Sequence, residues 1–235
     1  MANLFTDTGR VERALPLLRD FLKTNPNLAE AHWELGCAYR FGGMLAESVA
    51  ECERARQLDP RVKLNSSAIN GYLYLGQNEK FLQSLPENTD TAFVIFYRRL
   101  ASFCNKNWPL AAEDFDRAYQ LDASLLPAEN GKSYSYVIAR KNSKALELLR
   151  AAENKIDQRG VSDAQGIYKI AEAYSFLGEK SAAMRTLGQS IDKGFFPYPV
   201  FVSDPLLGPL RRETGFNVLR KVAQQRYETF KSSFF

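Results

Sequence analysis

The sequence predicts an all-α fold built from stacked antiparallel helix pairs. Small or apolar residues coincide when the chain is shifted against itself by 34 residues, as Ala14, Ser48 and Leu82 do, and as Ala111 and Ala145 do. That interval is the length of one helix–turn–helix unit, and such units stack to bury a continuous core. With 45% hydrophobic and 25% charged residues, the 235-residue chain has the composition of a folded protein with such a core.

The clearest unit is residues 29–60, AEAHWELGCAYRFGGMLAESVAECERARQLDP. Gly36 and Ser48 are small, and we place them where the two helices approach closely, because a large side chain there would push the helices apart. Gly42-Gly43 lets the chain leave the first helix with positive φ. The unit resembles the tetratricopeptide repeat (TPR). This resemblance implies a right-handed superhelical TPR solenoid of antiparallel helix pairs with a C-terminal capping helix.

The remaining units are looser, and together they predict how the chain is organised. A leading half-repeat covers residues 1–27, and five repeats follow at about 28–61, 62–88, 89–123, 124–160 and 161–194. Within them the pattern predicts helices over residues 78–85, 91–105, 109–121, 125–139, 143–157, 163–177 and 180–193. Residues 195–235 hold an aromatic and proline-rich crossing segment and the capping helix, which an open stack needs as a lid over its last apolar face.

A narrower resemblance lies in the C-terminal part of the chain. Its residues are Tyr174, Leu177-Gly178-Glu179-Lys180, Gly194-Phe195-Phe196, Asp204-Pro205-Leu206-Leu207, Leu210-Arg211 and Phe216. They resemble the closing region of TPR tails in bacterial serine/threonine kinases and winged-helix transcriptional regulators. The resemblance implies a docking or sensor module of a larger bacterial signalling protein. Kinase activity is not implied, since the sequence has no glycine-rich loop, no His-Arg-Asp and no Asp-Phe-Gly.

Composition and motifs favour a binding protein over an enzyme. One histidine and three scattered cysteines offer neither a metal site nor a disulfide framework. Asn130-Gly131-Lys132-Ser133 imitates the end of a phosphate loop, but the first glycine of that motif would fall at Leu126. We therefore expect no catalytic residue, no metal and no cofactor.

Charge and hydropathy point to a compartment. The 31 basic and 27 acidic residues nearly balance, so we expect no nucleic-acid partner. Neither a signal peptide nor an apolar stretch long enough to cross a bilayer is visible. These patterns predict a cytoplasmic protein without a membrane association.

The tetratricopeptide resemblance also implies a binding surface. In such repeats the first helix of each unit lines a concave groove, at the second, fifth, ninth and twelfth positions of the unit. Here those positions hold Glu30, Trp33, Cys37, Arg40, Tyr74, Arg98, Asn105, Asn130, Tyr134, Tyr168 and Glu172. Aromatic and arginine side chains dominate protein interfaces, so we expect a protein or peptide in this groove. Trp33 and Tyr134 fit packing between adjacent units equally well.

Self-association is the alternative function. The aromatic segment Phe195–Phe201 offers apolar surface that would pair two chains if it were exposed. The chain would then be the homodimerisation arm of its parent protein, with no separate peptide ligand.

Overall fold

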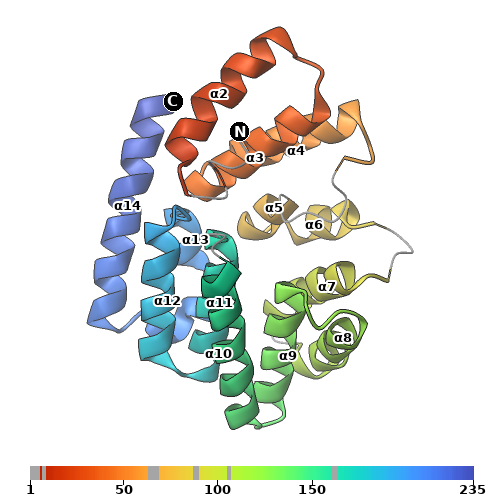
Figure 1. Ribbon diagram of the computed structural model, residues 1–235, viewed down its shortest axis with the longest axis vertical. Helices are drawn as coiled ribbons and strands as arrows, with labels where there is room; N and C mark the ends of the chain where they lie inside the picture. Colours follow the sequence, from red (N-terminus) through yellow and green to blue (C-terminus); the bar gives the residue numbers. More distant parts are fainter. Residues whose placement is uncertain (1–5, 7–8, 63–68, 87–89, 105–106, 160–162) are drawn as a thin grey trace. The chain divides into compact units, whose positions relative to one another are not determined.

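The computed structural model describes residues 6, 9–62, 69–86, 90–104, 107–159 and 163–235, and this part of the chain contains helices but no strand (Figure 1). The fold class is therefore all-α, as the sequence predicts. The helices are α2 Val11–Thr24, α3 Ala29–Gly42, α4 Leu45–Leu58, α5 Asn70–Tyr74, α6 Asn78–Ser84, α7 Ala92–Cys104, α8 Trp108–Leu121, α9 Leu126–Ile138, α10 Asn142–Arg159, α11 Ala164–Leu177, α12 Lys180–Asp192, α13 Tyr198–Ser203, the 3-10 helix η2 Pro205–Leu210, and α14 Thr214–Phe234.

Packing divides the chain into two units, each assembled from stretches that lie far apart in the sequence. Unit 1 comprises Met1–Ser84, Ile191–Ser203 and Arg220–Phe235, and unit 2 comprises Leu85–Ser190 and Asp204–Leu219. The region predicted as crossing segment and cap is thus shared between the units. The division into five repeats remains a prediction.

Unit 2 has the helix contacts of a repeat solenoid. Each helix packs on the next one along the chain, from α7 to α11, and in addition α7 contacts α9 and α9 contacts α11. The first helices of successive pairs therefore form one layer. Unit 1 shows the same sequential packing from α2 to α6. None of the described helices combines the length and the apolar character that a bilayer span requires.

The close approach of α3 and α4 falls where the small residues predict it. A Cβ atom on Gly36 would lie 2.7 Å from Cys52 Sγ and 3.0 Å from the main-chain oxygen of Ser48. The Ser48 hydroxyl donates a 2.7 Å hydrogen bond to the Gly36 carbonyl oxygen. Both small residues are thus required by the spacing of the two helix backbones.

The turns between paired helices use left-handed backbone. Gly43, Gly76 and Gly178 follow the first helix of their pairs with φ of 88°, 71° and 92°. The prediction of positive φ at Gly43 is confirmed, whereas Gly42 is the last residue of α3. The equivalent turn between α9 and α10 has Arg140 with φ of 58°. Arg140 thus adopts a left-handed conformation that glycine would adopt without steric cost.

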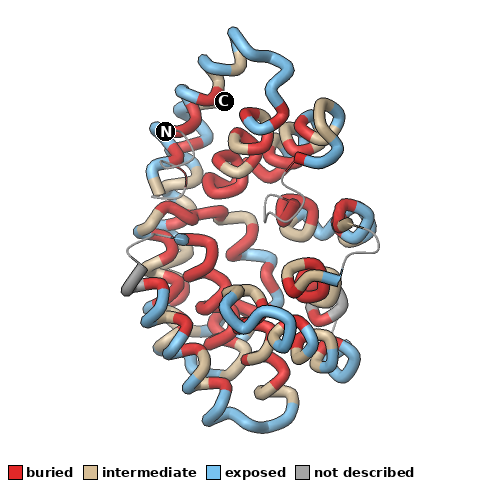
Figure 2. The backbone as a smooth tube through the Cα atoms, turned by 45° about the vertical axis from the view of Figure 1, so that its right-hand side comes forward, coloured by how far each residue is buried: buried red, intermediate tan, exposed pale blue. Residues whose placement is uncertain are grey.

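The aromatic segment Phe195–Phe201 is largely buried in unit 1, which corrects the expectation that it offers exposed apolar surface. Figure 2 shows how buried and exposed backbone alternate along the chain. Phe195 and Phe196 are 0% exposed and Phe201 is 1% exposed. The Phe195 ring packs edge-on against Phe41 at 5.2 Å, and the Phe196 main-chain N–H donates a 3.0 Å hydrogen bond to the Phe41 carbonyl oxygen. Arg226 lies over the Phe196 ring, 4.2 Å from its centroid.

Candidate interaction surface

Helix α3 places two of its four predicted groove residues in the core. Trp33 is 0% exposed and Arg40 is 1% exposed. The Arg56 guanidinium lies over the Trp33 ring, 5.9 Å from its centroid. Glu30 is exposed and Cys37 is half-buried, so α3 presents only these two predicted side chains to solvent.

Helix α5 contributes Tyr74, which is half-buried. Its ring centroid lies 6.4 Å from that of Phe195, in the crossing segment of the same unit. The predicted groove residue of this helix thus contacts the chain's own C-terminal part.

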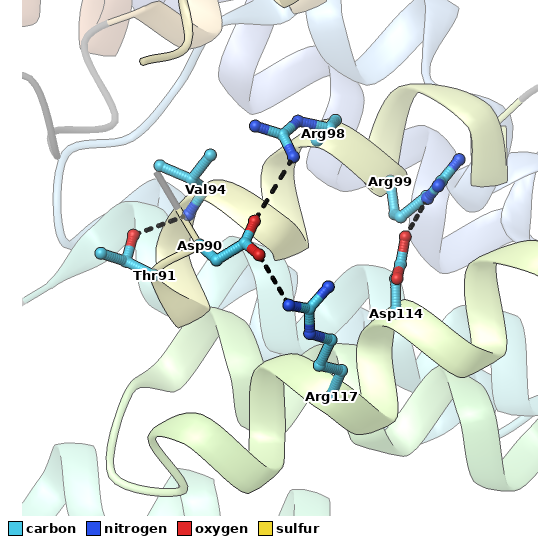
Figure 3. Close-up of polar contacts among 7 residues, drawn as sticks. All are labelled: Asp90, Thr91, Val94, Arg98, Arg99, Asp114 and Arg117. Carbon is cyan, nitrogen blue, oxygen red and sulfur yellow. Dashed lines mark hydrogen bonds and ion pairs between the residues drawn. The ribbon is translucent and has the colours of Figure 1, made fainter. Parts of the chain in front are cut away.

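Helix α7 carries Arg98 within a network of ion pairs (Figure 3). Arg98 Nη1 lies 3.9 Å from Asp90 Oδ1, while Arg117 donates a 2.6 Å hydrogen bond to Asp90 Oδ2. A second pair, Arg99 with Asp114, ties α7 to α8. The Arg98 side chain is 39% exposed, and its contact with Asp90 is longer than a hydrogen bond. Part of the Arg98 side chain is accordingly open to solvent. Asn105, also predicted for this helix, lies outside the described residues.

Helix α9 buries both of its predicted groove residues. Tyr134 stacks on Phe103, with ring centroids 4.6 Å apart, and meets Phe176 edge-on at 5.6 Å. The packing interpretation of Tyr134 therefore has direct support. Asn130 is 1% exposed, and within the described part of the chain neither atom of its side-chain amide has a hydrogen-bond partner.

Helix α11 holds a piece of the same chain against its predicted groove residues. This piece, residues 204–210, is named the Asp204 segment below and consists of Asp204 and η2. The hydroxyl of Tyr168 donates a hydrogen bond to the Asp204 carboxylate. About two turns further along α11, the Ser175 hydroxyl donates a 2.6 Å hydrogen bond to the Leu206 carbonyl oxygen. Leu206, Leu207 and Leu210 are 7%, 0% and 0% exposed.

The polar side of this contact is a buried cluster of ionisable groups. Lys169 Nζ lies 2.8 Å from Glu172 Oε1, and Asp204 is 9% exposed. Burial raises the pKa of Glu172 well above its usual range, although the Lys169 ammonium lowers it, and the nearby Asp204 carboxylate raises it further. Burial therefore favours the protonated form of Glu172.

Sequence reasoning did not single out Ser175, Asp204 or Leu206 as site residues. The only local signal is Asp204 before Pro205, a helix N-cap pattern, and the Leu206 N–H does donate a 2.7 Å hydrogen bond to Asp204 Oδ1. That signal predicts a helix start. It carries no information about which helix the segment packs against.

The described residues offer little to a metal or a small molecule. No group of three or more His, Cys, Asp or Glu side chains in that part of the chain is placed to hold a metal ion. A cavity of about 260 Å³ is lined in part by Leu126 and Ile156, but its polar wall residues Glu129 and Lys155 form an ion pair with each other.

Comparison with known proteins shows the fold. No family model and no curated protein matches the sequence. The structure described as the APC/C hetero-tetramer Cut9-Hcn1 superposes with a TM-score of 0.59 over 93% of this chain, at 13% sequence identity. The chain has a tetratricopeptide-type solenoid fold. It covers 47% of the Cut9-Hcn1 chain, and at this identity the likeness shows the fold alone.

Two further tetratricopeptide-type matches are more distant. A tetratricopeptide repeat protein from Parabacteroides merdae aligns over 98% of this chain and 90% of its own, with 19% identity and a TM-score of 0.47. Yeast Tom70 aligns over 93% of this chain and 48% of its own, with 16% identity and a TM-score of 0.40.

Proposed function

We propose that the chain binds a segment of another protein along the first helices of its repeats and catalyses no reaction. One observation supports this most directly: α11 already binds a polypeptide segment at predicted groove residues. Tyr168 donates to a carboxylate, and Ser175 on the same helix donates to a main-chain carbonyl oxygen. These are the two kinds of group that every acidic peptide presents.

The accessible part of the predicted groove is the proposed contact surface. Glu30, Cys37, Tyr74 and Arg98 are exposed or half-buried and would touch the partner directly. Six further groove positions are at most 1% exposed and would support the surface from behind or be covered by the chain itself, namely Trp33, Arg40, Asn130, Tyr134, Tyr168 and Glu172. Asn105 belongs to the same proposal.

The proposed context is a docking or sensor module of a larger bacterial signalling protein in the cytoplasm. Its support is the resemblance of Gly194-Phe195-Phe196 and Asp204-Pro205-Leu206-Leu207 to the tails of kinases and winged-helix regulators. The Cut9-Hcn1 structure is by its description a hetero-tetramer, which agrees with a solenoid that associates with a different chain.

Self-association remains the second candidate, with a different surface from the one expected. The buried crossing segment no longer supports it, but α2 exposes Leu17 and Phe21, 45% and 47% exposed and one helical turn apart. Light scattering tests it: a dimer that dissociates when Leu17 and Phe21 are changed to Ser would support the homodimerisation arm.

Site-specific photo-crosslinking tests the groove. A benzophenone amino acid placed singly at Glu30, Tyr74 or Arg98 should crosslink one and the same protein in lysate of the native host. The matched controls are Glu113 and Lys144, exposed residues on the second helices α8 and α10. Crosslinks from the control positions alone, or to different proteins at each groove position, would rule out groove binding.

A further inference from the structure

We infer that the Asp204 segment is a built-in ligand of α11, and that the partner's own segment is an acidic, leucine-rich stretch that exchanges with it. The inference rests on the proposed function and specifies the chemistry of the partner. It also means that the part of the binding surface formed by α11 is occupied by the chain itself.

Polar groups on both sides of the contact between α11 and the Asp204 segment are paired. Here the Asp204 carboxylate accepts from the Tyr168 hydroxyl, and the Leu206 carbonyl oxygen accepts from the Ser175 hydroxyl. Both donors project from α11, and both acceptors belong to one turn of the segment.

Two further ionisable side chains lie beside the Asp204 carboxylate in the interior. Lys169 is 6% exposed and Glu172 is 1% exposed, so an ammonium and a carboxyl group are kept in the interior beside Asp204. Removing a lysine from water is unfavourable unless an anion accompanies it. Lys169 pairs with Glu172, and the Asp204 carboxylate supplied by the segment is a second acid beside this buried pair.

The Asp204 segment has one buried face and one exposed face. Leu207 and Leu210 are fully buried, whereas Pro205 and Pro209 on the same short helix are exposed. Only one face of the segment therefore enters the protein. An external peptide with an acidic residue followed by leucines two, three and six positions later would present the same face.

A variant that changes the Asp204 segment but leaves α11 intact tests whether the segment occupies a binding site. Full-length Asp204→Ala keeps every α11 side chain but loses the carboxylate of the built-in segment. A fluorescent peptide with the sequence of residues 204–211, DPLLGPLR, is then titrated into wild-type and variant protein and followed by polarisation. Apparent affinity rises in proportion to the fraction of molecules with an open site, so the variant should bind at least about tenfold more tightly than wild type.

Two controls make the result specific. A peptide with alanine in place of the aspartate should bind the variant more weakly than DPLLGPLR, and this difference should shrink when Tyr168→Phe is added to the variant. Asp204→Asn, which retains the side-chain shape, replaces Asp204→Ala if circular dichroism shows that the alanine variant is unfolded. Absence of peptide binding to the folded variant up to about 1 mM, or equal binding of both peptides, would show that the segment is merely part of the core.

Failure of this inference is distinguishable from failure of the proposed function. If Glu30, Tyr74 and Arg98 crosslink a partner with the same efficiency in wild type and Asp204→Ala, a partner binds but the segment does not regulate it. If the crosslinks increase in the variant, the exchange is supported. If no groove position crosslinks in either protein, the proposed function itself is wrong.

Discussion

The Lys169 ammonium and the Glu172 carboxyl group lie 2.8 Å apart on consecutive turns of α11, and both are buried. Asp204 adds a second carboxyl group to the pair from outside the helix. One cation therefore faces two acids where water cannot separate their charges. Because burial raises the pKa of Glu172, the folded protein retains a proton that an unfolded chain releases in mildly acidic solution.

Stability should accordingly decrease as the pH rises. The folded pKa of Glu172 lies above the unfolded value of about 4.3, so between these values the native state binds more protons than the unfolded state, and the free energy of unfolding falls. Glu172→Gln replaces the protonated acid by a neutral isostere and should remove this loss. In urea unfolding it should match wild type near about pH 4 and exceed it near about pH 8, with Tm higher by about 2–4 °C per kcal/mol.

Glu179→Gln is the control for that experiment, because Glu179 is an exposed glutamate at the end of the same helix. Its pH profile should follow that of wild type. If Glu172→Gln were instead less stable than wild type near about pH 8, the ion pair with Lys169 would outweigh burial and the proton assignment would be wrong.

The turn at Arg140 should be improved by glycine. Its φ of 58° costs an L-residue about 1–2 kcal/mol relative to glycine, part of which is offset by the greater freedom of glycine in the unfolded chain. Arg140→Gly should therefore raise the free energy of unfolding by about 0.5–1 kcal/mol. Lys141→Gly, at the next exposed position, should give no gain. Equal effects of the two variants would mean that the left-handed turn carries no strain.

The α3–α4 contact should reject one added methyl group. Gly36→Ala places Cβ within 3.0 Å of the Ser48 main-chain oxygen, which cannot move without the helix, so a loss of about 1–3 kcal/mol is expected. Gly188→Ala is the matched control: in the interior of α12 its Cβ would meet only Leu219 Cδ2 at 3.4 Å. That variant should be unchanged or more stable by about 0.5–1 kcal/mol. Chemical denaturation with both variants checks the contrast, and a tolerated Gly36→Ala would contradict the helix spacing.

Arg19 should hold the end of α14 in unit 1. It donates hydrogen bonds of 3.0 Å to the Tyr39 hydroxyl and 2.9 Å to the Phe234 carbonyl oxygen, and lies 5.0 Å from the centroid of the Phe235 ring. Arg19→Ala should lower the free energy of unfolding by about 1–3 kcal/mol. Hydrogen exchange should accelerate at Thr229–Phe235 and stay unchanged in α11. Arg19→Lys should rescue only partly, because lysine lacks the planar donor fork.

The bounds of α6 to α12 could be predicted to within about two residues from the sequence, whereas α13 and η2 fall in the stretch predicted as a crossing segment. The expected helix at 163–177 corresponds to α11 Ala164–Leu177, and that at 78–85 to α6 Asn78–Ser84, which ends before Pro86. Both follow from local signals, namely the spacing of small residues and the exclusion of proline from helix interiors. The left-handed turn at Gly43 could be predicted for the same reason, because such a turn favours glycine.

The partners of the groove residues could not be predicted in the same way. Tyr168 and Glu172 occupy groove positions by their register in the repeat, but what covers them comes from 36 residues further along the chain, at Asp204. The register of the repeat predicts which face of a helix lines the groove, but it does not predict which distant segment packs on that face. Trp33 and Arg40 illustrate a second limit: a large side chain in the register of a groove is indistinguishable, by sequence, from one that fills the core.

The composition of unit 1 has a consequence for biosynthesis. Its helices α2–α6 are completed by residues 191–203 and 220–235, while residues 85–190 form unit 2. During translation the first eighty or so residues therefore leave the ribosome well before the C-terminal residues that bury Phe41, Gly42 and Tyr39 have been synthesised. Unit 2 needs no residue beyond Leu219, so its chain is fully synthesised before that of unit 1. The part of the chain that is synthesised first is therefore the last to be completed and protected from proteases.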